Sequence, residues 1–190
     1  TVVIDQSLAF ARDRLDHGLR LPVSVNVSTR CLLDAAFPSS VARQLADADV
    51  PPDMLCLEIT ESTIMVDPDR ALAVLRDLHS MGVRLSVDDF GTGYSSMAYL
   101  KILPVDELKV DRTFIRDMAT NDSNTALVQS AVDLGHNLGL AVVAEGVEDG
   151  ITLVALQAVG ADVIQGYYTG RPMAPDILRE WLSARTLATS

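Results

Sequence analysis

The sequence has few cysteine and histidine residues, which form the disulfide bonds of small secreted folds and the ligands of zinc sites. It contains only 2 cysteines and 3 histidines among its 190 residues. Cys31 and Cys56 lie in or beside apolar runs, so we expect reduced core side chains in place of a disulfide framework, which favours a cytosolic setting. His17, His79 and His136 are too scattered to form a zinc signature.

Basic residues are also in short supply. The 15 Lys and Arg residues face 26 Asp and Glu residues, which gives a net charge of -11 at pH 7. Nonspecific binding to DNA or RNA requires Lys and Arg to neutralise phosphates, so this balance argues against it. A substrate that carries phosphate would need bound cations to offset the acidic surface.

A long apolar run is missing as well. The longest apolar stretch lies near Leu138 to Ala144 and is interrupted by Gly139, whereas a bilayer span takes about 20 residues. No linker or charge block divides the chain, and 48% hydrophobic content is ample for one core, so we expect a single domain over residues 1–190. The chain starts at Thr1 without a signal-like segment, which predicts a fragment or a processed chain.

Two adjacent carboxylates begin the most informative segment. Asp88-Asp89-Phe90-Gly91-Thr92-Gly93-Tyr94-Ser95-Ser96 follows an apolar, strand-like run from 83 to 87. Neighbouring strand residues point to opposite faces, so both carboxylates can serve one site only if the strand ends between them. Gly91 and Gly93 would let the chain turn there. The pair indicates either a divalent metal site or a helix cap after a buried strand.

Polar residues recur at the ends of the other apolar runs. They are Asn26, Glu58, Lys109, Glu145 and Gln165. With Asp88 included, their spacing resembles the period of roughly 30 residues for a strand plus its crossover helix. A charged residue inside an apolar strand is costly unless something pairs with it, so this series predicts a shared polar site.

Periodicity and the positions of Pro and Gly predict six strands that alternate with helices. The expected strands are 23–27, 55–60, 83–87, 106–110, 140–145 and 162–167. The expected helices are 5–18, one capped by Ser39 and Ser40 that runs to about 48, 68–81, 95–101, 121–138, 149–159 and 175–184. Such alternation predicts a mainly parallel α/β sheet.

Polar residues at the C-terminal ends of strands suit either a TIM-like (β/α)8 barrel or an open doubly wound sheet. Gly91-Thr92-Gly93 is too short to count as a dinucleotide fingerprint, which favours the barrel. A barrel takes eight βα units and about 250 residues, so six units in this chain imply that the first two are missing. The sheet would then have two exposed edges.

Several motifs, in the same order along the chain, resemble those of the EAL-domain cyclic di-GMP phosphodiesterases. They are Val25-Asn26-Val27-Ser28, Glu58-Ile59-Thr60-Glu61-Ser62, the segment from Asp88 to Ser96, Leu108-Lys109-Val110-Asp111, Val143-Ala144-Glu145-Gly146-Val147-Glu148 and Gln165-Gly166-Tyr167. The resemblance covers essentially the whole chain. The Glu-Ala-Leu tripeptide that names the family is absent, because it belongs to the missing units. One metal ligand and a substrate-binding Arg are missing with it, which leaves turnover by this chain open.

The resemblance implies metal-dependent hydrolysis of cyclic di-GMP to linear pGpG in bacterial second-messenger signalling. It implies two Mg²⁺ or Mn²⁺ ions, with Asn26, Glu58 and Asp88 as ligands of one and Asp88 and Asp89 as ligands of the other. Oxygen ligands of this kind also suit such ions on physical grounds.

By the same resemblance, Lys109 and Glu145 orient and deprotonate the attacking water, and Gln165 steadies the water or the metal shell. Further site residues are Asp111, near the substrate or in the outer shell, and the loop supports Glu61 and Glu148. Each role has a structural alternative. Lys109 could form a buried ion pair with Glu107 or Asp111, Glu145 could cap the next helix, Gln165 could bond to backbone, and Glu61 and Glu148 could be plain N-terminal helix charges.

Two other functions compete with the hydrolase. One is a catalytically silent cyclic di-GMP receptor or interaction module of the same fold. The other is an enolase-type enzyme, although an Asp-Asp pair with an Asn ligand suits a two-metal phosphoryl site better. The resemblance further implies a homodimer and a GGDEF or sensor domain in the parent protein.

Overall fold

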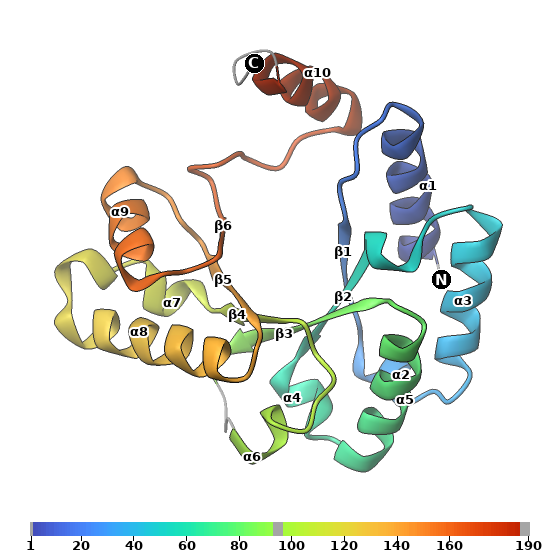
Figure 1. The fold of residues 1–190 in the computed structure, drawn as a ribbon, viewed down its shortest axis with the longest axis horizontal. Helices are drawn as coiled ribbons and strands as arrows, with labels where there is room; N and C mark the ends of the chain where they lie inside the picture. Colours follow the sequence, from blue (N-terminus) through green and yellow to red (C-terminus); the bar gives the residue numbers. More distant parts are fainter. Residues whose placement is uncertain (1, 93–96, 187–190) are drawn as a thin grey trace.

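The computed structural model describes residues 2–92 and 97–186. Its centre is one sheet of six parallel strands in the order in which they occur along the chain. The strands are β1 (Val23–Asn26), β2 (Leu55–Thr60), β3 (Arg84–Phe90), β4 (Glu107–Val110), β5 (Ala141–Glu145) and β6 (Val163–Gln165). Figure 1 shows the sheet curling inside a ring of helices, and the curl stays open between β6 and β1. The barrel-like fold is therefore confirmed as a partial barrel.

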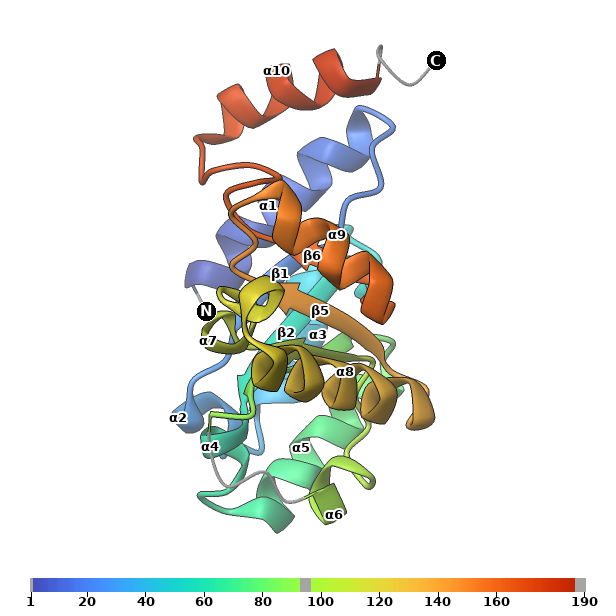
Figure 2. The same cartoon turned by 90° about the vertical axis from the view of Figure 1, so that its left-hand side faces the viewer.

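Helices follow the strands and cover the outer side of the curl (Figures 1 and 2). The longer ones are α1 (Val2–Asp16), α3 (Phe37–Asp47), α5 (Pro68–Ser80), α8 (Asp122–Asn137), α9 (Gly150–Val159) and α10 (Pro175–Thr186). Shorter turns are α2 (Thr29–Leu32), η1 (Pro52–Met54), α4 (Glu61–Ile64), α6 (Met97–Leu100), α7 (Arg112–Ile115) and η2 (Met118–Thr120). Within the described residues, no helix is long and apolar enough to cross a membrane.

The two faces of the sheet differ in polarity. Residues paired across parallel strands share a face, so the register assigns the buried side chains of Leu57, Leu85, Leu108 and Val142 to the outer face. Gly135 of α8 lies so close to Leu108 and Val142 that a Cβ there would collide with the Val142 side chain. Close helix packing on this face supplies the hydrophobic core.

The inner face carries the polar residues. Glu58 pairs with Ser86 and Asn26, Ser86 pairs with Glu107, and Glu145 pairs with Gln165. These strands therefore alternate between apolar side chains that face the helices and polar side chains that face the hollow of the curl. The alternation places the predicted functional residues on one concave surface.

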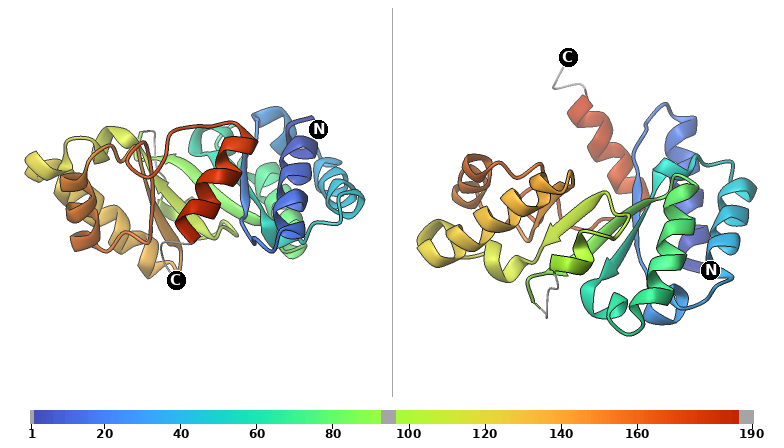
Figure 3. Two further views of the ribbon diagram at one scale, coloured as in Figure 1. Left: turned by 90° about the horizontal axis from the view of Figure 1, so that it is seen from above. Right: turned by 60° about the horizontal axis from the view of Figure 1, so that its bottom comes forward.

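The C-terminal helix crosses the open side of the curl. Figures 1 and 3 show α10 above the gap between β6 and α1. The Arg179 guanidinium of α10 lies 3.4 Å from the Asp13 carboxylate of α1. This exposed ion pair joins two helices near opposite ends of the chain.

Most predicted elements are present, with shifted ends. The predicted caps of α3 are wrong, because the helix begins at Phe37 with Pro38 in its first turn and places Ser39 and Ser40 inside the helix. The strand predicted over 162–167 is confined to Val163–Gln165. The caps of α8 are confirmed at Asn121, whose side chain accepts from the backbone N–H groups of Ser123 and Asn124.

Candidate active site

Lys109 lies at the centre of a buried ion-pair cluster on the inner face. Its Nζ atom is 2.6 Å from Oε1 of Glu145, 3.0 Å from Oε1 of Glu58 and 3.2 Å from Oδ1 of Asp88. The Lys109 side chain is only 4% exposed. The cluster joins β2, β3, β4 and β5 at their C-terminal ends. The alternative in which Lys109 pairs with Glu107 or Asp111 is not what the structure shows, since Glu107 pairs with Arg84.

The charges of the cluster shift two pKa values. Burial works against the charged form of Lys109, but the hydrogen bond to Glu145 and the Glu58 carboxylate outweigh it, so the pKa of Lys109 is raised. Burial raises the pKa of Glu145, although the ammonium of Lys109 opposes that shift. Lys109 therefore stays a cation, and Glu145 holds a proton more readily than an exposed glutamate.

Asp88 and Asp89 come to the same side of the sheet by a different route from the predicted one. The strand does not end between them, because β3 continues to Phe90. Instead, the pairing of β3 with β4 steps from Val87 and Leu108 to Phe90 and Val110, which places one extra residue on β3. Asp89 takes the left-handed φ of 56° at this bulge, and its N–H donates to Oδ1 of Asp88 at 3.0 Å. The bulge thus brings neighbouring carboxylates to the same side.

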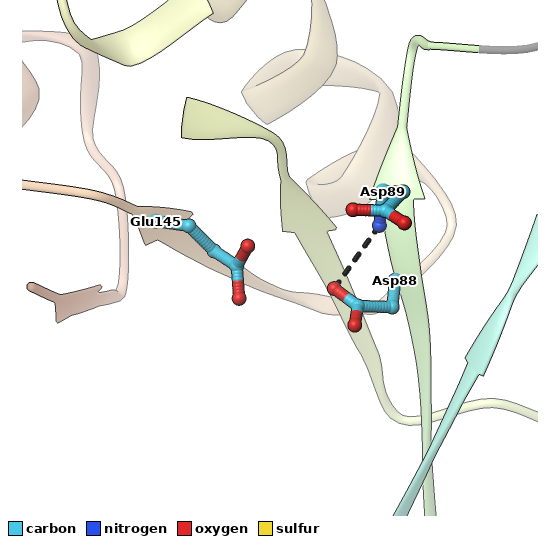
Figure 4. A group of neighbouring side chains, drawn as sticks. All are labelled: Asp88, Asp89 and Glu145. Atoms are coloured by element: carbon cyan, nitrogen blue, oxygen red, sulfur yellow. Dashed lines mark hydrogen bonds between the residues drawn. The ribbon is translucent and has the colours of Figure 1, made fainter. Parts of the chain in front are cut away.

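Three carboxylates converge where these strands end. Each of Asp88, Asp89 and Glu145 has an oxygen within 4.8 Å of the other two, and Figure 4 shows their side chains approaching one another from β3 and β5. Burial first, and then the charges of Asp88 and Asp111, raise the pKa of Asp89. Repulsion of this kind falls when a cation binds, and an all-oxygen donor set suits Mg²⁺ or Mn²⁺.

Asn26 and Gln165 lie at the two ends of the arc. Asn26 is exposed at the end of β1 and is the register partner of Glu58. Gln165 is exposed at the end of β6 and is the register partner of Glu145, while its backbone carbonyl accepts from the N–H of Val147. The structure thus brings all six predicted strand-end residues to one edge of the sheet, with four of them in direct contact through Lys109.

Comparison with known proteins identifies the family of the chain. The EAL domain family matches residues 1–172. The chain belongs to the EAL domain family. It is 42% identical over 177 residues to the bifunctional diguanylate cyclase/cyclic di-GMP phosphodiesterase MucR of Pseudomonas aeruginosa, covering 93% of this chain and 26% of MucR. It is 41% identical over 165 residues to the cyclic di-GMP phosphodiesterase NbdA of the same organism, covering 87% of this chain and 21% of NbdA.

Solved EAL structures share the fold. The MucR phosphodiesterase in complex with c-di-GMP superposes with a TM-score of 0.88 at 42% identity, over 93% of this chain and 72% of that one. The EAL domain of Mycobacterium smegmatis DcpA gives a TM-score of 0.90 at 33% identity, over 96% of this chain and 82% of that one. The chain therefore spans most of a solved EAL domain, but only about a quarter of the two curated relatives.

Three strand-end motifs of this EAL domain share a local design. In each, the residue two positions after the site residue caps a short helix: Ser28 after Asn26, Thr60 after Glu58 and Asp111 after Lys109. Oδ1 of Asp111 accepts from the backbone N–H of Thr113 at 2.9 Å. The cap ends the strand and turns the chain away, which leaves the preceding inward side chain at the rim.

The proposed loop supports occupy different environments. Glu61 opens α4 and lines a small hollow together with Phe90, where the loop of 90 to 96 begins. Residues 93–96 of that loop lie outside the described residues. Glu148 is exposed, and its neighbour Asp149 caps α9 by accepting from the N–H of Thr152. Asp149 therefore takes the capping role that was the structural alternative for Glu145.

The sequence analysis did not identify the polar residues that lie on the inner face one layer before the site residues. Ser86 and Arg84 interrupt the run read as apolar, and with Cys56 and Glu107 they form a second polar layer on the inner face. Their alternation with a period of two along the strand was the signal in the sequence that could have identified them.

Phe114 was also not identified from the sequence. Its ring lies 2.9 Å from where a Cβ on Gly91 would be, and Gly91 has a φ of 95°. No local signal points to that contact.

Proposed function

We propose that this EAL domain hydrolyses cyclic di-GMP to linear pGpG with the help of two Mg²⁺ or Mn²⁺ ions. The observation that carries the proposal is the group of Asp88, Asp89 and Glu145 beside the buried ammonium of Lys109. Relatives named as cyclic di-GMP phosphodiesterases support the choice of substrate. Such ions, when bound, would polarise the phosphodiester and ease deprotonation of water.

The side chains of the chain divide the remaining work. Asn26, Glu58 and Asp88 would hold one ion, and Asp88 with Asp89 the second. Glu145 would accept the proton of the attacking water, since its raised pKa makes it a stronger base than an exposed carboxylate. Lys109 would orient that water and keep Glu58 and Asp88 in place. Gln165 would steady the water from the neighbouring strand.

The proposal extends to the full-length protein. The relative MucR is named as a bifunctional enzyme and is about four times as long as the matched segment. We therefore propose a GGDEF or sensor domain beside this one, a homodimer and a cytoplasmic location. A silent cyclic di-GMP receptor is the second candidate, because no Glu-Ala-Leu tripeptide occurs within this chain.

Chromatographic assay of pGpG release by the full-length protein separates these functions. We expect turnover with Mg²⁺ or Mn²⁺ and none in excess chelator. Ca²⁺ should bind yet support little turnover, because its longer and looser coordination is poorly suited to holding the reacting phosphodiester. Turnover in chelator would contradict the metal-dependent hydrolase. Tight cyclic di-GMP binding without product under every metal condition would favour the receptor.

A further inference from the structure

A hollow of about 370 Å³ begins at Gln165, the register partner of Glu145 in the ion-pair cluster. Its walls come from the segment after β6 and from α10, and they include Tyr167, Arg171 and Trp181. Gln165 borders the hollow and is also the register partner of Glu145. The hollow and the cluster therefore border neighbouring strand ends, β6 and β5.

The backbone holds Tyr167 in a fixed position at the edge of the hollow. The N–H of Val147 donates to the carbonyl of Gln165 at 3.1 Å, and the N–H of Tyr168 donates to the carbonyl of Val147 at 2.9 Å. Gly166 lies against the Val147 backbone so closely that any Cβ there would collide with it. The Tyr167 side chain, which lines the hollow, stays 56% exposed. A large exposed aromatic on a braced backbone is a surface available to a flat ligand.

Arg171 completes this surface. Its guanidinium carbon lies 5.1 Å from the centroid of the Tyr167 ring, which is a cation–π distance. Aromatic rings and Arg planes are the groups on which unpaired nucleobases stack. Arg also matches the O6 and N7 acceptors of guanine with two parallel donors. An arginine here is favourable to an anionic nucleotide in a chain of net charge -11.

We propose that Tyr167 and Arg171 form a subsite that stacks one guanine of cyclic di-GMP while its phosphodiester lies at the cluster of Lys109. This inference rests on the proposed function for the identity of the ligand. It assigns base recognition to residues outside the carboxylate cluster, so binding of the base and binding of metal are separable.

The adjacent tyrosine supplies a matched control. Tyr168 is 48% exposed, similar to Tyr167, but its hydroxyl packs beside Gly150 at the start of α9, and it does not line the hollow. The test compares Tyr167→Ala, Tyr167→Phe, Arg171→Ala and Tyr168→Ala in the full-length protein. Calorimetry measures cyclic di-GMP affinity with Ca²⁺ present, and a separate titration measures Mn²⁺ affinity.

Tyr167→Ala should weaken cyclic di-GMP binding about 5- to 150-fold, the range expected for loss of one base–aromatic stack. Arg171→Ala should weaken it as well, whereas Tyr167→Phe and Tyr168→Ala should bind almost as the natural protein does. Mn²⁺ affinity should stay the same in all four variants. Equal affinities for Tyr167→Ala and Tyr168→Ala, with the natural protein binding cyclic di-GMP, would overturn the subsite alone. Failure of the natural protein to bind cyclic di-GMP would overturn the proposed function as well.

Discussion

Lys109 and Glu145 form the shortest ion pair of the buried cluster, with 2.6 Å between Nζ and Oε1. The same ammonium also contacts Glu58 and Asp88, so one cation offsets three carboxylates from three strands. Removing one partner of a buried ion pair leaves uncompensated charge, which typically costs about 3–5 kcal/mol. The stability of this edge of the sheet and its affinity for cations are therefore linked through Lys109.

Replacing Lys109 with Met should lower the melting temperature and make it more sensitive to divalent cations. The three carboxylates lose their counterion, and Mg²⁺ or Mn²⁺ can restore it. Thermal melts with and without Mn²⁺ measure both effects. Lys101→Met, at an exposed position, is the control and should melt as the natural chain does. If Mn²⁺ raises both melting temperatures equally, Lys109 and metal do not share these carboxylates.

Replacing Glu145 with Gln should remove most phosphodiesterase activity and leave cyclic di-GMP binding largely intact. The change keeps the shape of the side chain and deletes the base, and a general base typically contributes about 10²- to 10⁴-fold. Product release by the full-length protein is the measurement, with Glu180→Gln, at an exposed position of α10, as control. Near-normal turnover by the Glu145 variant would exclude it as the base.

The contact between Phe114 and Gly91 should govern metal affinity through Asp89. The ring packs directly over Gly91, two residues after the left-handed Asp89. Phe114→Ala frees the bulge to move, and we expect Mn²⁺ binding to weaken about 10-fold, the lower end for residues that orient metal ligands. Phe114→Leu, which refills part of the space, should lose less. A lower melting temperature with unchanged Mn²⁺ affinity would reduce Phe114 to a packing role.

The outline of this site was predictable, whereas its detailed shape was not. Strand-end polar residues, Gly82 after α5 and the Asn121 cap are local signals, and each appears in the sequence within a few residues of the feature it specifies. The bulge at Asp89 depends on the register against β4, and the Phe114 contact joins residues 23 positions apart. Tertiary pairing decides both, so alternation and spacing along the chain do not reveal them.

Cys56 should resist alkylation in the folded protein. Burial, and then the nearby Glu107 carboxylate, raise its pKa to about 12, so almost no reactive thiolate forms at pH 8. The half-buried Cys31 provides the comparison within the same chain. Iodoacetamide labelling followed by peptide mass spectrometry should modify Cys31 first and Cys56 only after unfolding. Equal labelling of both thiols in the native state would mean that the β2 region opens readily.

The open edges of the sheet should make the 190-residue chain self-associate. In the described residues β1 pairs only with β2, and β6 only with β5, so each presents an edge to another chain. The exposed ion pair between Arg179 and Asp13 places α10 across the gap without adding a strand. Exposed ion pairs of this kind typically contribute only about 0–1 kcal/mol to stability. The contact of α10 with α1 therefore closes the open side of the curl only weakly.

Two measurements on this chain and on the full-length protein test these points. Sizing chromatography tests self-association, and a cyclic di-GMP hydrolysis assay tests whether the set of metal ligands is complete. We expect the 190-residue chain to form oligomers and to turn over substrate poorly, because the Glu-Ala-Leu ligand expected from the family is absent and the cage is incomplete. The full-length protein should be compact and active if it carries the first two barrel units. A monomeric and fully active 190-residue chain would show that six strands suffice for both closure and catalysis.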